Sequence, residues 1–235
     1  MKAQEKEDLK KKRSLDAVET TVALDALAVY VNDKSPLQEI SLPQLAKIYT
    51  GETTNWKDVG GADKKITTYG RENSSGTYAY FKEHVLANKD FAPAVQTLAG
   101  TSAVANAVKG DENGIGYGGI AYLEGVRALK VKKDDAATAV AASLQTAQDG
   151  TYPLARPMCF VLNIKPGSAA QPVLQDFIRY CMSYEGQRDS AIRGDYPVSR
   201  EMTAEAYAAV GITMSATTDA PEAPKAVGTK TPAAK

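Results

Sequence analysis

The stretch of this sequence best suited to chemistry is YGRENSSGTYAYF, residues 69–81. Its pattern predicts a strand that ends near Gly70 and a helix that begins near Thr77. The first turn of a helix exposes N–H groups without intrahelical partners, and the helix dipole makes that end positive. An oxyanion binds well at such an end. The residues that would form this site are Arg71, Ser74, Ser75, Gly76 and Thr77.

Each of these residue types has a reason to be in an anion site. The serine and threonine hydroxyls can cap the helix, and Gly76 would let the backbone approach a ligand closely. Arg71 can add a two-pronged donor to the same oxygens. A simpler interpretation stays open, in which Ser74 or Ser75 only caps the helix and Arg71 lies in water.

Two glycine motifs suggest nucleotide binding, and both fit poorly. Gly70 and Gly76 are separated by five residues, whereas a phosphate loop needs four followed by a lysine. The run GIGYGG at 114–119 spells G-x-G-x-x-G, with acidic residues about 20 positions downstream. Residues 109–113 before it predict a turn instead of the buried strand that a dinucleotide fold requires.

Catalytic and metal chemistry have little support in the composition. The single histidine, His84, lies in the helix predicted from Thr77 to Ala87, where we expect it at the surface and not in a serine triad. Cys159 and Cys181 are predicted to be buried free thiols, although one disulfide stays open. We therefore expect a protein that is not an enzyme, with no metal site and no organic cofactor.

Charge and hydropathy limit the partners. Lys+Arg and Asp+Glu number 28 each, so there is no basic field for nucleic acid. No run approaches the roughly 20 apolar residues of a membrane span. The charged start MKAQEKEDLKKK is not typical of a signal peptide, so the sequence as it stands predicts a soluble, unexported chain.

Strands and helices alternate along most of the chain, which predicts the α/β class. Residues 2–13 predict a solvated helix or arm, and Ser41 and Gly51 are expected to bound a short helix. Residues 113–126 predict a strand, a glycine turn and a short helix, and 134–150 an alanine-rich helix or loop. Other strands are expected within 18–32, 65–70, 126–133 and 156–164, other helices at 77–87, 101–110 and, as a pair, 171–194, and a disordered tail at 213–235.

Several stretches, taken in order, resemble the substrate-binding proteins of phosphate ABC transporters. The resemblance extends over about residues 18–200. Its most specific part is the loop around Trp56 (residues 52–65) together with R-x-x-S-S-G-T at 71–77. The matching stretches are 18–32, 42–61, 70–81, 114–131, 152–163 and 177–187.

The resemblance implies a type II periplasmic-binding-protein fold, with two α/β lobes and a ligand cleft between them. It places a remnant of lobe 1 at 1–31, lobe 2 at 32–154, the return to lobe 1 at 155–212 and the tail at 213–235. It also implies that Arg71, Ser75, Gly76 and Thr77 grip phosphate. Family members usually carry about a hundred residues and a signal peptide before the segment that matches Val18. We therefore expect an incomplete first lobe, an internal start or a truncated chain, and weaker affinity.

Phosphate keeps a proton at neutral pH, so a site that rejects sulfate needs an acceptor, usually a carboxylate. Asp25 is our candidate, because an isolated charge is rarely placed in an apolar strand such as VALDALAV without a task. The alternative is an acid at a strand end, paired with a helix amide or an arginine.

The resemblance implies a monomer that binds inorganic phosphate for an ABC importer, touches the membrane permease and works in the periplasm or outside the cell. The alternatives are a phosphate sensor or adhesion protein that does not transport, a binder of sulfate or molybdate, and a phosphatase-like hydrolase. Trp56 is expected to pack a loop and Arg156 to form a salt bridge, while Tyr117 and Tyr122 are expected in the core.

Overall fold

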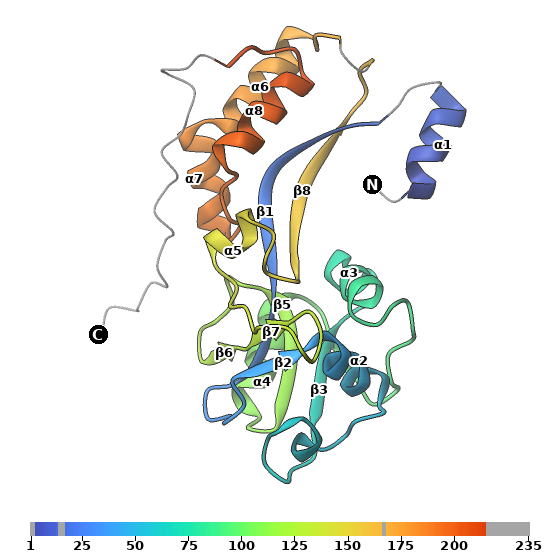
Figure 1. The fold of residues 1–235 in the computed structure, drawn as a ribbon, viewed down its shortest axis with the longest axis vertical. Helices are drawn as coiled ribbons and strands as arrows, with labels where there is room; N and C mark the ends of the chain where they lie inside the picture. Colours follow the sequence, from blue (N-terminus) through green and yellow to red (C-terminus); the bar gives the residue numbers. More distant parts are fainter. Residues whose placement is uncertain (1–2, 14–16, 166–167, 215–235) are drawn as a thin grey trace. The chain divides into compact units, whose positions relative to one another are not determined.

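The computed structural model describes residues 3–13, 17–165 and 168–214. The chain divides into two compact units, of which unit 1 comprises Met1–Asp25 and Pro157–Lys235 and unit 2 comprises Ala26–Arg156. The long strand β1 (Val18–Asn32) contributes its first part to unit 1 and its second part to unit 2 (Figure 1). The predicted tail lies outside the described residues from position 215 onward.

Unit 2 is built around a mixed sheet, which confirms the α/β class. Its strand order is β4-β3-β5-β1-β6, and β8 pairs with β1 outside this path. The strand β3 runs parallel to β4 and β5, whereas β5 and β6 run antiparallel to β1. The bounds are β3 (Thr67–Arg71), β4 (Gln96–Leu98), β5 (Gly114–Gly119) and β6 (Val126–Ala128). A separate parallel pair joins β2 (Glu39–Ser41) to β7 (Lys130–Lys132).

The first three α-helices of unit 2 begin and end close to where the sequence predicts, whereas the helix within 134–150 is limited to residues 144–148. In α2 (Leu42–Thr50) Ser41 forms a capping box with Gln44, and Gly51 closes the helix with φ 83°. The strand β3 leads to α3 (Gly76–His84), and β4 leads to α4 (Thr101–Gly110). The remaining short helices are η1 (Trp56–Val59) and α5 (Leu144–Gln148).

Glycines of β5 allow α4 to lie directly on the sheet. A Cβ built at Gly116 would stand 2.6 Å from Val104 Cγ1 and 2.9 Å from Val108 Cγ2. The glycine-rich run is therefore a strand that must be bare on one face. The strand predicted within 113–126 is confirmed and a turn follows it at Gly119, whereas the predicted short helix is wrong. The residues buried at this contact are Ala28, Tyr30, Val104, Ala105, Val108 and Val126.

Alternate residues of β5 face the other side of the sheet, where aromatic rings from α2 and α3 gather. Tyr117 stacks on Phe81 with ring centroids 3.9 Å apart, and Tyr49 meets Phe81 edge-on at 4.8 Å. The Tyr49 hydroxyl donates to the Tyr69 carbonyl at 3.0 Å. These contacts fix the start of α3 relative to β3.

Unit 1 contains α1 (Ala3–Arg13), the first part of β1, most of β8 (Ala155–Leu162) and three further helices. The helix pair predicted at 171–194 is confirmed as α6 (Pro172–Met182) and α7 (Tyr184–Arg193). The helix α8 (Arg200–Ala209), which the sequence analysis did not predict, packs against α6 (Figure 1). Leu162, Ile178, Met182 and Tyr207 are buried together between these elements.

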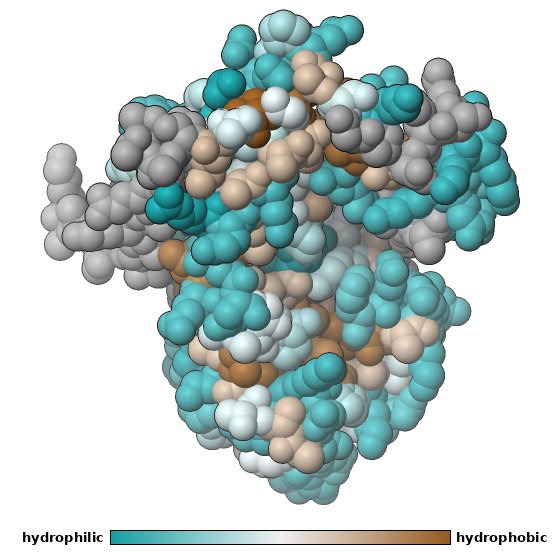
Figure 2. All heavy atoms as spheres, turned by 45° about the horizontal axis from the view of Figure 1, so that its top comes forward, coloured by the Kyte–Doolittle hydropathy of each residue, from teal (hydrophilic) through white to brown (hydrophobic). Residues whose placement is uncertain are grey.

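Unit 1 leaves large apolar side chains exposed along β8 and α6. Phe160 and Phe177 touch each other, with centroids 5.2 Å apart, yet remain 38% and 46% exposed. Val173 is 73% exposed. Figure 2 shows hydrophobic residues, coloured brown, at the surface among hydrophilic residues, coloured teal. This exposed set, which we call the β8/α6 face, comprises Met158, Phe160, Val173, Phe177 and Tyr180, while Val161 is exposed on the opposite side of β8.

Three predictions about single residues need correction or qualification. Cys159 is exposed, because the described residues leave β8 exposed on both sides from residue 157 to residue 161, and Cys181 is only partly buried, although both thiols are free. Tyr122 is 44% exposed because it follows β5 in a turn, whereas Tyr117 is fully buried as predicted.

Within the described residues, no helix is long and apolar enough to cross a membrane.

Replacing Gly116 with alanine is expected to destabilise the chain by about 1–3 kcal/mol, because the new methyl would enter space held by Val104 and Val108. Urea unfolding measures the change. Gly110→Ala is the matched control. Gly110 is the last residue of α4, and a Cβ there would meet nothing within 4 Å. Equal stability of the two variants would contradict the close contact of α4 with β5.

Candidate functional site

Arg71 is the last residue of β3 and is held by two hydroxyl groups. Its backbone N–H donates to the Tyr117 hydroxyl at 3.4 Å, and its Nη1 donates to Thr101 Oγ1 at 2.8 Å. Burial raises the pKa of Tyr117 well above its ordinary value, so the phenol stays neutral beside the guanidinium. The interpretation that Arg71 simply lies in water is therefore wrong.

The Arg71 guanidinium keeps unused donors. Its Nε is buried without a hydrogen-bond partner, and within the described residues no carboxylate forms an ion pair with it. Buried donors are nearly always paired in proteins, and leaving one unpaired costs about 1–3 kcal/mol. An arginine with neither a carboxylate nor a full set of acceptors is suited to receive an anion.

The N-terminus of α4 adds positive potential beside this guanidinium. Thr101, which accepts from Arg71, is the first residue of α4. The N-cap, Gly100, offers no side-chain acceptor, and the first turn contains no acidic residue. A helix N-terminus would normally be balanced by such a group. Arg71 and the end of α4 thus form a positive region without a compensating acid in that turn.

The N-terminus of α3 follows Arg71 after one tight turn, closed by the Ser75 N–H to the Glu72 carbonyl at 3.0 Å. Ser75 Oγ accepts from the Thr77 N–H at 3.1 Å and from the Tyr78 N–H at 3.4 Å. The capping interpretation is thus correct for Ser75, and the amides of Ser75 and Thr77 both already have acceptors within the protein. The N–H of Gly76 has no partner in the part of the chain that the structure describes.

Several further donors at this turn are unused. The hydroxyls of Ser74 and Thr77 take part in no hydrogen bond with another described residue, and the Ser75 hydroxyl accepts bonds without donating one. The first turn of α3 contains no acidic residue, and a Cβ at Gly76 would meet nothing within 4 Å. Open space beside donors that lack acceptors favours a ligand made of acceptors.

Asp25, the sixth predicted residue, belongs to unit 1, whereas the other five belong to unit 2. It lies in β1 next to Leu24, which bonds with Tyr196. Burial and, to a smaller extent, the negative charge of Asp25 raise the pKa of Tyr196. The role of Asp25 toward a ligand stays a prediction.

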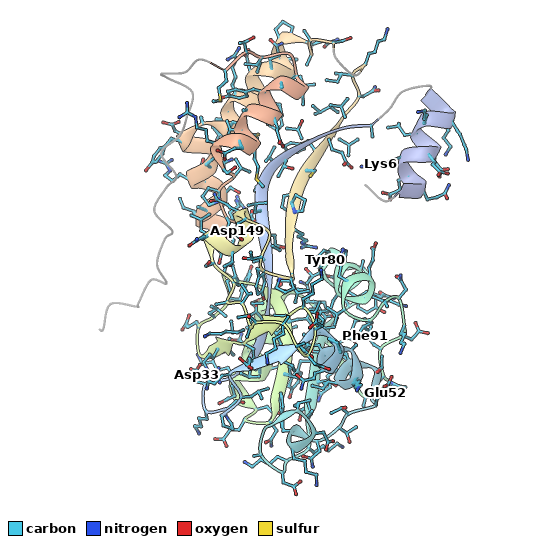
Figure 3. All side chains as sticks on the ribbon, viewed as in Figure 1. Lys6, Asp33, Glu52, Tyr80, Phe91 and Asp149 are labelled. Atoms are coloured by element: carbon cyan, nitrogen blue, oxygen red, sulfur yellow. The ribbon has the colours of Figure 1, made fainter. Side chains whose placement is uncertain are left out.

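The helix α3 also carries the histidine and meets the end of unit 2. Tyr80 (Figure 3) donates its hydroxyl to the Ala155 carbonyl at 3.2 Å, and the Arg156 guanidinium lies over its ring at 5.0 Å. His84 is exposed, as predicted, and stacks on Tyr80 at 4.0 Å. The sequence analysis missed the contact between Arg156 and Tyr80, because 76 positions separate the two residues.

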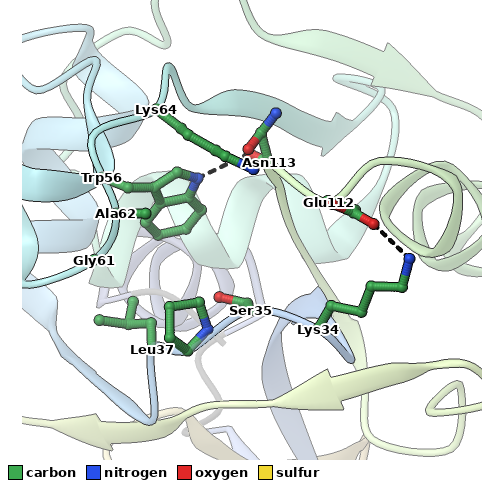
Figure 4. Close-up of a pocket in the computed structure, with 10 residues that line it drawn as sticks. Lys34, Ser35, Leu37, Trp56, Gly61, Ala62, Lys64, Glu112 and Asn113 are labelled. Atoms are coloured by element: carbon green, nitrogen blue, oxygen red, sulfur yellow. Dashed lines mark hydrogen bonds and ion pairs between the residues drawn. The ribbon is translucent and has the colours of Figure 1, made fainter.

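A second part of unit 2 forms a pocket of about 70 Å³. The Trp56 indole N–H donates to the Asn113 carbonyl at 3.0 Å, and Lys34 pairs with Glu112 (Figure 4). Trp56 therefore packs a loop, as predicted, and also lines the pocket, which no sequence signal indicated. Lys64 is a further cation of the lining, so this pocket is a rival place for an anion.

The described residues include no group of three or more His, Cys, Asp or Glu side chains that could hold a metal ion.

Comparison with known proteins adds the family. Residues 1–185 match the model of the PBP superfamily domain. The chain belongs to the PBP superfamily. The α/β fold described above is therefore confirmed as periplasmic-binding-protein-like.

Three proteins illustrate the similarity. The phosphate-binding protein PstS of Pseudomonas aeruginosa PAO1 is 31% identical over 204 residues, and the match covers 81% of this chain and 63% of that protein. PstS of Staphylococcus haemolyticus is 33% identical over 211 residues, covering 86% and 64%. The crystal structure of an ABC-type phosphate transport receptor from Vibrio cholerae superposes with a TM-score of 0.65 at 27% identity, covering 77% and 72%. The chain thus spans less than two thirds of these two PstS proteins.

Replacing Ser75 with alanine is expected to destabilise the ligand-free protein by about 1 kcal/mol, since two amides of α3 lose their acceptor. Ser74→Ala is the control and should stay within about 0.5 kcal/mol, because Ser74 is exposed. Urea unfolding without added anions measures both. A loss at Ser74 that matched the loss at Ser75 would contradict the cap assignment.

Proposed function

We propose that this chain binds inorganic phosphate as the solute-binding component of an ABC phosphate import system. The observation that carries the proposal is Arg71, a partly buried arginine that pairs with no carboxylate of residues 3–13, 17–165 and 168–214. It lies next to the N-terminus of α4 and one turn before α3. The names of the relatives, phosphate-binding protein and phosphate transport receptor, support the same ligand.

Phosphate complements this site because its oxygens are acceptors and its charge is negative. The proposed donors are the Arg71 guanidinium, the Gly76 N–H and hydroxyls at the turn. Charge-assisted hydrogen bonds of this kind are roughly twice as strong as neutral ones. The proposed ligand residues are Arg71, Ser74, Ser75, Gly76 and Thr77, with Asp25 as the acceptor for the phosphate proton.

We also propose that unit 2 corresponds to lobe 2 and unit 1 to an incomplete lobe 1, with lobe 2 at 32–154 and its flanks in lobe 1. The exposed β8/α6 face supports this assignment, since a sheet with apolar side chains in water is marginal by itself. The greater length of the relatives supports it too.

The remaining features of the proposal follow from the transport role. The chain acts by binding and not by catalysis, needs no cofactor, works as a monomer in the periplasm or outside the cell, and delivers its ligand to a membrane permease. The description of the Vibrio cholerae relative as a transport receptor supports this role. Hydrolysis of any member of a panel of phosphomonoesters by this chain would contradict a role limited to binding.

Calorimetric titration with phosphate tests the proposal. Arg71→Ala is expected to weaken binding by about 2–5 kcal/mol, or roughly 30-fold or more, because the anion loses its charged donor. Lys64→Ala is the control for the rival pocket and is expected to leave affinity unchanged. Sulfate is expected to bind more weakly than phosphate if Asp25 accepts the proton.

Two results would contradict the proposal. If Arg71→Ala bound phosphate as well as the unchanged chain, Arg71 would not be a ligand. If Lys64→Ala lost binding instead, the anion would lie in the pocket beside Trp56. Equal affinity for sulfate would leave phosphate binding in place and remove only the role of Asp25.

A further inference from the structure

Thr101 stands out because its contact with Arg71 is the only hydrogen bond that the guanidinium makes to the described residues. Arg71 Nη1 donates to Thr101 Oγ1 at 2.8 Å, while Nε has no partner. Thirty residues separate the two positions in sequence. One hydroxyl group therefore fixes one edge of the guanidinium.

The position of Thr101 is itself set by a glycine on each side. Gly100, directly before it, has φ 84° and ψ 151°, a backbone conformation that essentially only glycine adopts. A Cβ built at Gly118 of β5 would stand 2.2 Å from Thr101 Cγ2. The threonine methyl thus occupies space that exists only because Gly118 has no side chain.

This arrangement selects one rotamer of Thr101. A β-branched side chain carries its methyl and hydroxyl on the same carbon, so a fixed methyl also fixes the direction of the hydroxyl. With its methyl against Gly118, Thr101 directs its oxygen to Arg71. Tyr30 also borders the space beside Gly118. Its hydroxyl donates to the Gly119 carbonyl and lies 3.0 Å from the Cβ built at Gly118.

The Thr101 hydroxyl also suits the electrostatic surroundings of Arg71. Arg71 lies at the positive end of α4, a place that disfavours a cation. A neutral acceptor at the first residue of the helix holds the guanidinium without cancelling its charge. A carboxylate there would hold it more tightly but would compete with an incoming anion.

We propose that Thr101, supported by Gly118, is a positioning residue for Arg71, and that it orients the guanidinium so that its other donors stay available to the ligand. The proposal rests on the proposed function for the identity of that ligand. The restraint that Thr101 places on Arg71 does not depend on it.

Two measurements test the proposal, on three variants in the first turn of α4 and on Gly118→Ala in β5. Thr101→Val keeps the methyl and removes the hydroxyl, Thr101→Ser keeps the hydroxyl, and Ser102→Ala removes an exposed hydroxyl on the same turn as a control. Nitrogen-15 NMR follows the exchange between the two Nη positions of Arg71 in the ligand-free chain. Calorimetry follows inorganic phosphate binding.

In the NMR experiment, Thr101→Val is expected to speed the exchange of the Arg71 Nη positions several-fold, while Thr101→Ser and Ser102→Ala keep it slow. In the titration, Thr101→Val is expected to weaken phosphate binding about tenfold, the loss typical of a hydrogen bond to a charged group, and Thr101→Ser to restore most of it. Gly118→Ala is expected to resemble Thr101→Val in both experiments, because its methyl displaces that of Thr101.

The outcomes separate the two proposals. Exchange as fast in the unchanged chain as in Thr101→Val would overturn the role of Thr101, whatever the ligand. Slow exchange with phosphate affinity unaffected by Thr101→Val would also overturn it, because the restraint would then have no consequence for binding. If the unchanged chain failed to bind phosphate while the exchange pattern held, the proposed function would fail and the restraint on Arg71 would stand.

Discussion

The structure of the candidate site depends on one positive charge, that of Arg71, which no carboxylate of the described residues neutralises. Arg71 is partly buried, keeps a buried Nε without an acceptor, and borders a helix N-terminus whose first turn has no acid. Such an arrangement is unfavourable in isolation, because buried donors and cations are normally paired. It becomes favourable when an anion supplies the acceptors. The ligand-free cost and the binding gain have the same physical origin.

The sheet of unit 2 determines where the charge of Arg71 lies. The parallel strands β3 and β4 each lead to a helix, so the N-termini of α3 and α4 both follow strands that pair side by side. Gly116 and Gly118 allow α4 to lie against β5, and Tyr117, from the opposite face of β5, supplies the hydroxyl that accepts from the Arg71 backbone. One glycine-rich strand therefore supports the site from both of its faces.

Local signals in the sequence predicted much of the fold and of the candidate site. The features that the sequence analysis missed depend on contacts between residues far apart in the chain. Ser41 and Gly51 could be identified as helix caps because capping depends on neighbours a few positions away. The strand β5 was misjudged after its first residues, because glycine by itself predicts a turn and only α4 explains its absence of side chains. Thr101 was not singled out, since nothing near it in sequence reveals Arg71 thirty residues earlier. The exposure of Cys159 likewise depends on what covers β8.

The most direct test of the central claim is to titrate the nitrogen-15-labelled chain with phosphate and to follow which N–H resonances move. If phosphate binds as proposed, the largest changes occur at the Gly76 amide and the Arg71 Nε–H, two N–H donors that have no acceptor among the described residues. Changes concentrated at Lys34, Trp56 and Asn113, with the Gly76 and Arg71 resonances unmoved, would place the anion in the pocket beside Trp56 and contradict this mode of binding.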